Sequence, residues 1–288
     1  MVEHSAHHGS VILYHVPPSF YSQVVRLGLE EKGVAYQGTI VAPGPPSYET
    51  YEPWYMRINP MGTVPTLLID GESIDDSRRI LQAIEDGFEG PSLMPSDPDD
   101  RAGVEFWVEE AYQVPERVLA YGSGRLKALG SRVNRSRLKA LRKWRSRVPD
   151  MAAVYDKKIA DIEGFMSAAA DPDGVDAAWR ATAEKLDRLD AELAGKDFCC
   201  GGAYTMADVV WTVTVARQLL LGKDPFAGRP ALLDWFERMK TRPSFSRADV
   251  WTRFKPEAML PVLLSKYRWQ VLAATILFAL AAAAVMRL

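Results

Sequence analysis

Cysteine is scarce in this sequence: its 288 residues contain two, adjacent at Cys199 and Cys200. Neighbouring cysteines cannot build a disulfide framework and lack the spacing of a metal site, so they favour a reducing compartment and no bound metal. The first ten residues also lack the positively charged start and the apolar stretch of a secretory signal, and they are not rich in arginine. We therefore expect no cleaved targeting peptide.

The composition lacks any extreme. Hydrophobic residues make up 48% of the chain and charged residues 25%, which is typical of globular proteins. These values exclude a disordered chain and a membrane protein with many spans. A chain of 288 residues is long enough for two domains, each with its own core.

Acidic residues are missing from 122–149, where ten basic residues fall in a chain whose net charge is −2. Apolar residues recur there near helical spacing, so the stretch is predicted to be a basic, partly amphipathic helical segment. Two interpretations stay open: it faces an anionic lipid surface or an acidic protein partner, or it is a solvated helical hairpin. A nucleic-acid partner is disfavoured, because no nucleic-acid-binding motif accompanies the charge.

Long hydrophobic runs are absent until the end of the chain, where the 18 residues 269–286 carry no charge. A helix of 18 residues spans about 27 Å, close to the hydrocarbon core of a membrane. We expect 265–288 to form a C-terminal membrane anchor with a single transmembrane helix at 269–286. A buried C-terminal helix is the alternative, although a helix of this length normally shows a polar face.

The patterns of strands and helices divide the chain into two halves. We predict strands at 10–15, 34–41, 66–69 and 72–74, and helices at 22–32 and 76–86. After Leu93 the pattern is helical only, with helices predicted at 99–120, 151–169, 176–193, 206–221, 231–240 and 245–253. The fold class is therefore α+β, with one domain expected at 10–90 and a helical domain at 98–264.

The segment 52–65 is predicted to be a loop that ends in a Val-Pro step and leads directly into a strand. Proline at a strand start lacks the N–H of a central ladder, and X-Pro is the bond at which a cis peptide costs little. A cis bond at Val64-Pro65 would turn a backbone edge outward, where a peptide-like ligand could pair with it. An ordinary trans proline at the strand start is the alternative.

Motifs in both halves narrow the family. They are V-R-L-G-L-E-E-K-G at 25–33, E-P-W-Y-M-R-I-N-P at 52–60, the Val64-Pro65 step, T-M-A-D-V at 205–209 and R-P-S-F at 242–245. In this order of strands and helices they resemble the glutathione S-transferase superfamily. Within it, the chain is most similar to the ganglioside-induced differentiation-associated proteins and the plant tetrachlorohydroquinone-dehalogenase-like (TCHQD) transferases.

The resemblance implies a thioredoxin-like N-terminal domain, an all-helical C-terminal domain with 122–149 as a basic insertion, and glutathione as co-substrate without a metal. It implies an enzyme, a membrane-tethered Ser-type glutathione transferase that conjugates glutathione to electrophilic apolar substrates. The alternative is a non-catalytic transferase fold, either an interaction protein or an accessory subunit at a mitochondrial membrane. The expected location is a mitochondrial membrane, with the outer membrane first and the peroxisome or endoplasmic reticulum as alternatives. A homodimer or a larger membrane complex is the expected assembly.

The resemblance also implies a catalytic hydroxyl. In Ser-type members, the hydroxyl that activates the glutathione thiol lies six residues before the V-R-L motif, which is Ser19 here. Ser22 is the second choice, with an N-cap of the first helix as its other role. A turn hydroxyl after Pro17-Pro18 is the alternative for Ser19.

Glutathione-binding residues follow in the same way. Val64, ahead of a cis Pro65, is similar to the residue whose backbone pairs with the cysteinyl part of glutathione. Asp76 and Ser77 match the acidic-Ser pair that holds the γ-glutamyl group, although capping of the following helix explains the same residues. Asp208, three residues after Thr205, resembles the capping box of the family's helical core, which is a folding role.

One feature departs from the pattern of the superfamily. Many members hold the glycine carboxylate of glutathione with a basic residue between the second strand and the Val-Pro loop, and 33–56 contains no Lys, Arg or His. Either Arg57 replaces that residue, or the glutathione site is weak or lost.

Overall fold

The structure is a computed structural model that describes residues 9–45, 47–123 and 126–258. Contacts group 1–254 into one compact unit and 255–288 into a second. Only 255–258 of the second unit are described, so the account below concerns the first unit.

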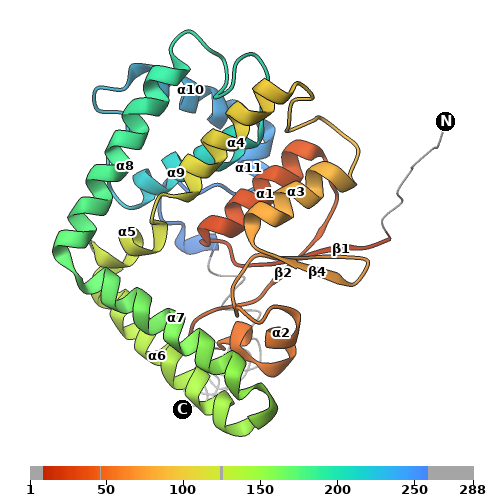
Figure 1. Ribbon diagram of the computed structural model, residues 1–288, viewed down its shortest axis with the longest axis vertical. Helices are drawn as coiled ribbons and strands as arrows, with labels where there is room; N and C mark the ends of the chain where they lie inside the picture. Colours follow the sequence, from red (N-terminus) through yellow and green to blue (C-terminus); the bar gives the residue numbers. More distant parts are fainter. Residues whose placement is uncertain (1–8, 46, 124–125, 259–288) are drawn as a thin grey trace, which may run out of the picture. The chain divides into compact units, whose positions relative to one another are not determined.

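A four-stranded sheet forms the core of the N-terminal half (Figure 1). Its strands are β1 (Val11–His15), β2 (Gln37–Ile40), β3 (Thr66–Ile69) and β4 (Glu72–Asp75), in the order β2-β1-β3-β4. β1 and β2 are parallel, whereas β3 is antiparallel to both β1 and β4. The Asp70-Gly71 turn joins β3 to β4, with positive φ at both residues.

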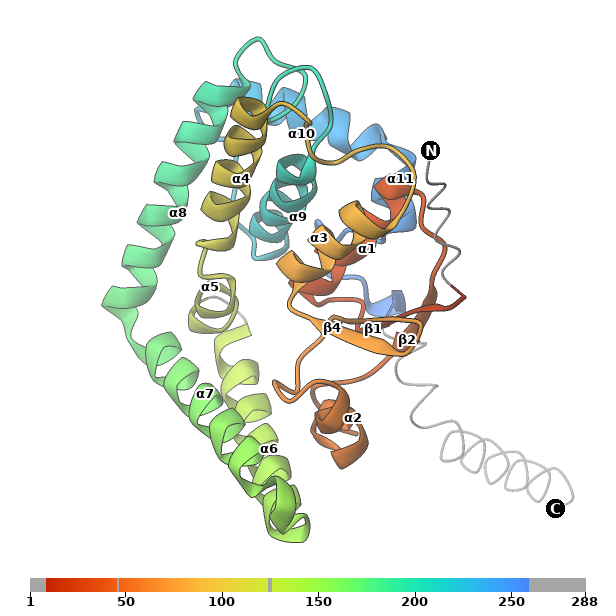
Figure 2. The same cartoon turned by 45° about the vertical axis from the view of Figure 1, so that its right-hand side comes forward.

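Two helices cover one face of the sheet, α1 (Phe20–Lys32) and α3 (Ser77–Gly87), and α2 (Pro53–Ile58) lies on the other (Figures 1 and 2). The layer between sheet and helices is filled by Leu13, Val25, Leu29, Leu67, Ile80 and Ile84. α1 ends at Gly33, whose φ of 76° suits a residue without Cβ. This arrangement confirms the thioredoxin-like domain expected from the sequence.

The regular elements of the second half are helices in its described residues, apart from an isolated bridge between Phe198 and Gly201. Its helices are α4 (Pro98–Tyr112), α5 (Glu116–Gly122), α6 (Leu126–Arg147), α7 (Ala152–Ala170), α8 (Pro172–Leu193), α9 (Met206–Leu220), α10 (Pro230–Thr241) and α11 (Pro243–Arg247), with a 3₁₀ turn, η2 (Pro149–Met151), between α6 and α7. α9 is buried along almost its whole length and packs against α1 and α4. The core of the helical half, which includes Trp211 of α9 and Trp235 of α10, therefore continues into Phe20 and Val24 of α1.

The basic insertion forms one arm of a helical hairpin, α6, and α7 forms the other. α6 and α7 lie side by side and pack on η1 (Glu49–Tyr51) and α2 of the N-terminal half (Figure 2). Tyr51 and Met56 share one buried cluster with Leu138, Leu141 and Tyr155. The apolar side of α6 is therefore used for packing, which leaves its basic side outward.

Several predicted boundaries were wrong. The helix predicted at 99–120 is broken into α4 and α5, because Pro115 lacks the N–H that a continuous helix needs. The predicted loop at 52–65 contains α2, which begins with Pro53 at its first position, where proline is well tolerated. The second strand is four residues long instead of the predicted eight. Its neighbours Val34 and Tyr36 instead pack beside the sheet core.

The predicted transmembrane helix requires a correction. No helix in the described ranges is long and apolar enough to cross a membrane; α9, buried in the core, has 15 residues. The fold class is therefore a thioredoxin-like domain with a helical domain, without the transmembrane helix, and the tail-anchored and membrane-tethered assignments are withdrawn. The anchor predicted at 265–288, with its helix at 269–286, lies outside the described residues.

The capping box predicted at the start of α9 is confirmed. Asp208 accepts hydrogen bonds from the backbone N–H groups of Cys199 and Thr205 at 2.9 Å each, from the Thr205 hydroxyl and from the indole of Trp235 at 3.0 Å. The carboxylate is fully buried, and burial raises its pKa even though these bonds oppose the rise. One side chain thus joins the α8–α9 connection, the start of α9 and α10.

We predict that Asp208→Ala lowers the free energy of unfolding by about 3 kcal/mol or more, because two N–H groups and an indole lose their buried acceptor. Urea unfolding followed by circular dichroism measures the change. Asp187→Ala is the matched control: Asp187 is exposed and pairs with Arg229, so its loss should cost less than about 1 kcal/mol. Equal effects in the two variants would contradict the structural role of Asp208.

Candidate active site at one edge of the sheet

Three segments meet at one edge of the sheet because of its strand directions. The register pairs Tyr14 of β1 with Thr66 of β3, and Thr66 with Asp75 of β4. The chain that leaves β1, the chain that enters β3 and the chain that leaves β4 therefore share this edge. They carry Ser19, Val64 and Asp76, which were predicted as site residues from the sequence.

Two arginines hold the segment that carries Ser19. Arg26 of α1 donates to the carbonyl of Pro17 at 3.1 Å, and Arg217 of α9 donates to the carbonyl of Pro18 at 2.9 Å. Arg217 also pairs with Glu116 of α5 at 3.1 Å, and all three charged side chains are at least nine-tenths buried. The position of Ser19 is therefore fixed by both halves of the unit.

Ser19 is the N-cap of α1. Its Oγ accepts a hydrogen bond from the backbone N–H of Ser22 at 3.3 Å, so the N-cap role expected for Ser22 belongs to Ser19. Ser19 is partly exposed, and its oxygen lies at a helix N-terminus, which favours a nearby anion. Ser22 is completely buried, and its Oγ has no hydrogen-bond partner among the described residues. Of the two hydroxyls, that of Ser19 is the accessible one.

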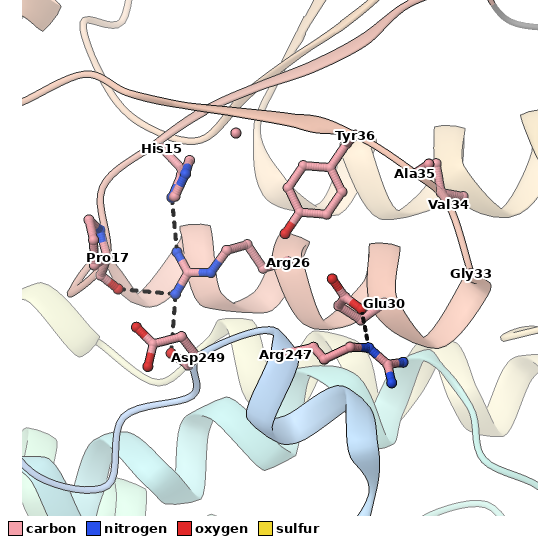
Figure 3. A pocket seen from close by; sticks show the side chains of 11 residues that line it. His15, Pro17, Arg26, Glu30, Gly33, Val34, Ala35, Tyr36, Arg247 and Asp249 are labelled. Atoms are coloured by element: carbon pink, nitrogen blue, oxygen red, sulfur yellow. Dashed lines mark hydrogen bonds and ion pairs between the residues drawn. The ribbon is translucent and has the colours of Figure 1, made fainter. Parts of the chain in front are cut away.

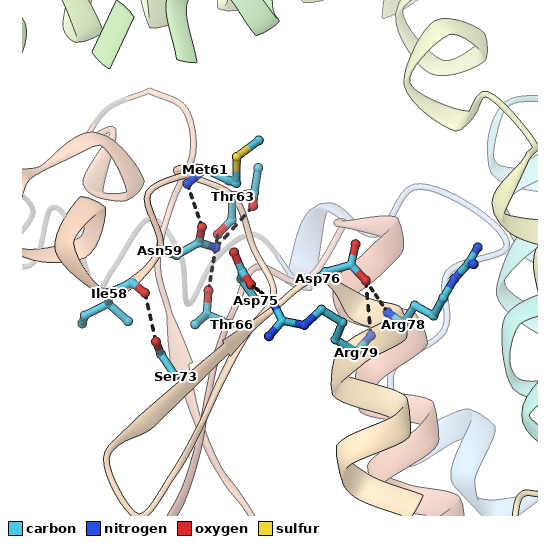
Figure 4. A network of polar contacts seen from close by, with 10 residues as sticks. All are labelled: Ile58, Asn59, Met61, Thr63, Thr66, Ser73, Asp75, Asp76, Arg78 and Arg79. Atoms are coloured by element: carbon cyan, nitrogen blue, oxygen red, sulfur yellow. Dashed lines mark hydrogen bonds and ion pairs between the residues drawn. The ribbon is translucent and has the colours of Figure 1, made fainter. Parts of the chain in front are cut away.

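The Val64-Pro65 bond is cis, as the first interpretation of this step predicted, and not an ordinary trans bond. Buried Asn59 and Tyr55 fix the loop before it. Asn59 Nδ2 donates to Thr63 O and Thr66 Oγ1 (Figure 4). The Tyr55 hydroxyl donates to Thr63 O at 2.6 Å. The backbone N–H and C=O of Val64 form no hydrogen bond with any other described residue. They are therefore available as an unpaired backbone edge.

Asp76 and Ser77 open α3. Asp76 accepts hydrogen bonds from the backbone N–H groups of Arg78 and Arg79, at 2.9 and 3.2 Å, and adopts a φ of 67° (Figure 4). Ser77 is buried, and its Oγ accepts a hydrogen bond from the Tyr112 hydroxyl of α4 at 2.9 Å. The capping role of Asp76 is thus observed, while a role in binding a ligand stays a prediction.

Two aromatic side chains lie beside these residues. The rings of Tyr21 and Tyr112 are parallel within 5°, with centroids 6.4 Å apart. The Arg78 guanidinium lies 4.7 Å from the centroid of the Tyr112 ring. Burial raises the pKa of Tyr21 to about 12, and the nearby carboxylates of Glu116 and Asp76 add to the rise.

Two arginines in the structure are candidates for the cation expected near the glycine end of glutathione. Arg57 is exposed on α2 and lies 3.8 Å from Asp150, so it pairs weakly with the α6–α7 hairpin. Arg137 of α6 donates to the carbonyl of Pro43 at 2.8 Å, just after β2. The insertion therefore brings an arginine to the stretch of sequence that lacks one.

A pocket of about 740 Å³ opens next to Arg26 and does not include Ser19, Val64 or Asp76 (Figure 3). Arg26 also donates to the carbonyls of Ala248 and Asp249 and lies 3.1 Å from His15 Nδ1. Burial and the Arg26 charge lower the pKa of His15 to about 4. The polar residues that line this pocket therefore belong to a structural hydrogen-bond network around the buried Arg26.

The two cysteines lie in the α8–α9 connection, away from the three segments of the site. Cys199 is fully buried, and burial raises its pKa well above the ordinary value; the pKa of Cys200 rises to about 12 for the same reason. Both therefore stay protonated at neutral pH. No group of three or more metal-ligating side chains occurs in 9–45, 47–123 and 126–258.

The fold and this edge define a thioredoxin-like domain joined to a helical domain, with an unpaired backbone N–H and C=O just before a cis proline. Comparison with protein families identifies two matches: the glutathione S-transferase N-terminal domain at residues 13–92 and the glutathione S-transferase C-terminal domain at 172–238. The chain belongs to the glutathione S-transferase family, whose co-substrate is glutathione. The family and the co-substrate predicted from the sequence are thereby confirmed.

Relatives include the two groups expected from the motifs. The chain is 33% identical to tetrachloro-p-hydroquinone reductive dehalogenase of Sphingobium chlorophenolicum over 85% of this chain and 98% of that protein. Identity is 26% with glutathione S-transferase TCHQD of Arabidopsis thaliana, covering 82% of this chain and 88% of the relative. It is also 26% with human ganglioside-induced differentiation-associated protein 1-like 1, covering 83% and 73%.

Solved structures show the same fold. The β-etherase LigF from Sphingobium sp. strain SYK-6 superposes with a TM-score of 0.64 at 23% identity, covering 83% of this chain and 98% of LigF. A glutathione S-transferase from Methylobacterium radiotolerans, in complex with glutathione sulfonate, gives a TM-score of 0.63 at 20% identity, covering 85% and 97%.

Sequence reasoning missed Tyr21, Arg217 and the contacts of Tyr112 with Ser77 and Tyr21. Arg26 is the arginine of the V-R-L motif, but the sequence analysis assigned it no role. Its place in that motif was the only sequence signal that could have pointed to it. Arg217 carries no such signal, because its partner carbonyl is 199 residues away in the chain.

His15 provides a test of the network around Arg26. Its folded pKa of about 4 lies below the ordinary 6.5, so the folded state favours neutral His15. The resulting stability is complete above pH 6.5 and is lost as the pH falls towards 4. We predict that over this range wild type loses up to about 3 kcal/mol more than His15→Gln, measured by urea unfolding. Parallel losses in the two proteins would refute the assignment.

Proposed function

We propose that this protein is a Ser-type glutathione transferase that conjugates glutathione to electrophilic apolar compounds. The observation that carries the proposal is the accessible Ser19 Oγ at the N-terminus of α1, at the same sheet edge as the unpaired backbone of Val64. Val64 pairs with the cysteinyl backbone of glutathione, and Asp76 with Ser77 binds its γ-glutamyl group.

The role of Ser19 is to favour the thiolate form of glutathione. The Ser19 oxygen already accepts the N–H of Ser22, so its own proton is free to be donated to sulfur. Such a hydrogen bond, together with the partial positive charge of the helix N-terminus, lowers the pKa of the bound thiol. The displaced proton goes to solvent.

The acceptor is proposed to be a halogenated aromatic compound. One relative is named for the dehalogenation of tetrachlorohydroquinone, and the parallel rings of Tyr21 and Tyr112 beside the site suit a flat apolar acceptor. The thiolate attacks a ring carbon that carries chlorine. A C–S bond forms, the C–Cl bond breaks, and chloride leaves with the bonding electron pair.

We propose conjugation rather than reduction. Removing the sulfur again to leave a reduced ring would use a second thiol to form a mixed disulfide. Neither cysteine of this chain lies at the proposed site, and the pKa values of both are raised by burial. The chain therefore supplies no protein thiolate for that step.

We predict that Ser19→Ala lowers kcat/KM for glutathione with a chlorinated aromatic acceptor about a hundredfold, because one donor to the developing thiolate is lost. Chloride release measures the rate, and isothermal titration measures glutathione binding. Ser19→Thr keeps a hydroxyl and should retain most activity. Ser22→Ala is the matched control, since its hydroxyl is buried, and it should behave as wild type.

The possible outcomes separate two failures. Absence of glutathione binding to wild type at millimolar concentration would refute the proposed function as a whole. Full activity in Ser19→Ala, with loss in Ser22→Ala, would instead retain the function and reverse the assignment of the hydroxyl.

A second candidate function is an interaction protein, and the basic face of α6 favours it. Arg132, Arg135, Lys139 and Lys143 recur at helical spacing, are exposed, and form no ion pair with another described residue. Arg142 and Arg145, by contrast, pair with Glu163 and Asp156 of α7. An acidic protein segment is the partner that fits such a stripe.

We predict that the full chain binds a fluorescent polyglutamate peptide and that changing these four basic residues to Gln weakens binding at least tenfold, measured by anisotropy at low salt. Changing Arg142 and Arg145 to Gln is the control with paired charges. Equal affinity of wild type and the four-residue variant would exclude the stripe as a docking surface.

A further inference from the structure

The hydroxyl of Tyr21 has no assigned role. Tyr21 lies two residues after Ser19, in the first turn of α1, and is partly exposed. Its hydroxyl forms no hydrogen bond with any other residue that the structure describes. A tyrosine that is mostly buried usually finds a partner for this group. The unused donor therefore lies beside the candidate thiol site.

Contacts from α1 and α4 fix the ring. Phe20 meets it edge to face, with centroids 4.9 Å apart, and Tyr112 of α4 lies parallel to it at 6.4 Å. Tyr112 is held in turn by its hydrogen bond to Ser77 of α3. The ring of Tyr21 is thus linked through Tyr112 to Ser77 of the proposed γ-glutamyl site.

Charged groups of both signs face this hydroxyl. They are Glu116 and Arg117 of α5, Asp76 before α3, and Arg217 of α9. With the pKa of Tyr21 near 12, the phenol stays protonated at neutral pH. A protonated phenol can donate a hydrogen bond to an anion, but it cannot serve as a base for the thiol.

We propose that Tyr21 is a second donor to the glutathione thiolate: its hydroxyl donates to the sulfur from the side of α3 and α4, while Ser19 donates from the helix N-terminus. This rests on the proposed function. A thiolate accepts more than one hydrogen bond, and each bond to the charged form lowers the pKa of the thiol. Two donors to the sulfur therefore lower the pKa of the thiol further than the Ser19 hydroxyl does alone.

The test is a titration of bound glutathione in the full chain. The ultraviolet absorbance of the thiolate, recorded against pH, gives the thiol pKa in wild type, Tyr21→Phe and Tyr36→Phe. Tyr36 is a matched control because it is also partly buried, with a pKa raised by burial, but lines the pocket at Arg26 instead. We expect the thiol pKa to rise by about one unit in Tyr21→Phe and to be unchanged in Tyr36→Phe.

A second measurement separates a direct contact from a structural effect. S-methylglutathione has no thiolate, so its affinity should be the same in wild type and Tyr21→Phe. A thiol pKa unchanged in Tyr21→Phe, with glutathione bound, would overturn the role of Tyr21 and leave the proposed function intact. If Tyr21→Phe lost affinity for S-methylglutathione together with the pKa shift, the donor role of Tyr21 would also be overturned, because the ring would then position the whole ligand. If wild type binds no glutathione, the proposed function itself fails, and the role of Tyr21 with it.

Discussion

The hydrogen bonds to the carbonyls of Pro17 and Pro18 connect the two halves of this unit. Arg26 binds the first and Arg217 the second, and Arg26 continues to the carbonyls of Ala248 and Asp249 after α11. A proline has no N–H, so its carbonyl is its only backbone hydrogen-bonding group. Two buried guanidinium groups satisfy both carbonyls and join β1, α1, α9 and the chain end of the unit.

This constraint determines the chemistry available at the sheet edge. Buried charges are tolerated when they are fully hydrogen-bonded, and Arg217 meets this condition through Pro18 and Glu116. The segment before α1 therefore has little freedom, and Ser19 and Tyr21 project from a fixed turn. A hydroxyl that must face a thiolate needs such a support, because a donor held in place stabilises the charge without having to reorganise.

Much of this arrangement could be predicted from local sequence, and the remainder could not. The Thr205–Asp208 capping box and the positions of the strands along the chain follow from short-range patterns, which act within a few residues. The break at Pro115 was missed because apolar periodicity continued through it. The contacts of Arg217 and the stacking of Tyr21 on Tyr112 join residues far apart in sequence. They depend on helix packing, which a single sequence does not encode locally.

The basic insertion shows how one helix combines structural and surface roles. Arg137 turns inward to the Pro43 carbonyl, while Leu138 and Leu141 pack with Tyr51 and Met56. The inner face of α6 therefore supports the segment between β2 and β3, in which the sequence has no cation of its own before Arg57. Because this face is occupied, the basic residues on the outer face contribute little to packing, and their charge is left for solvent or for a partner. The basic composition of the insertion thus reflects its exposed face, whereas its contact with the N-terminal domain comes from the inner face, where Arg137, Leu138 and Leu141 lie.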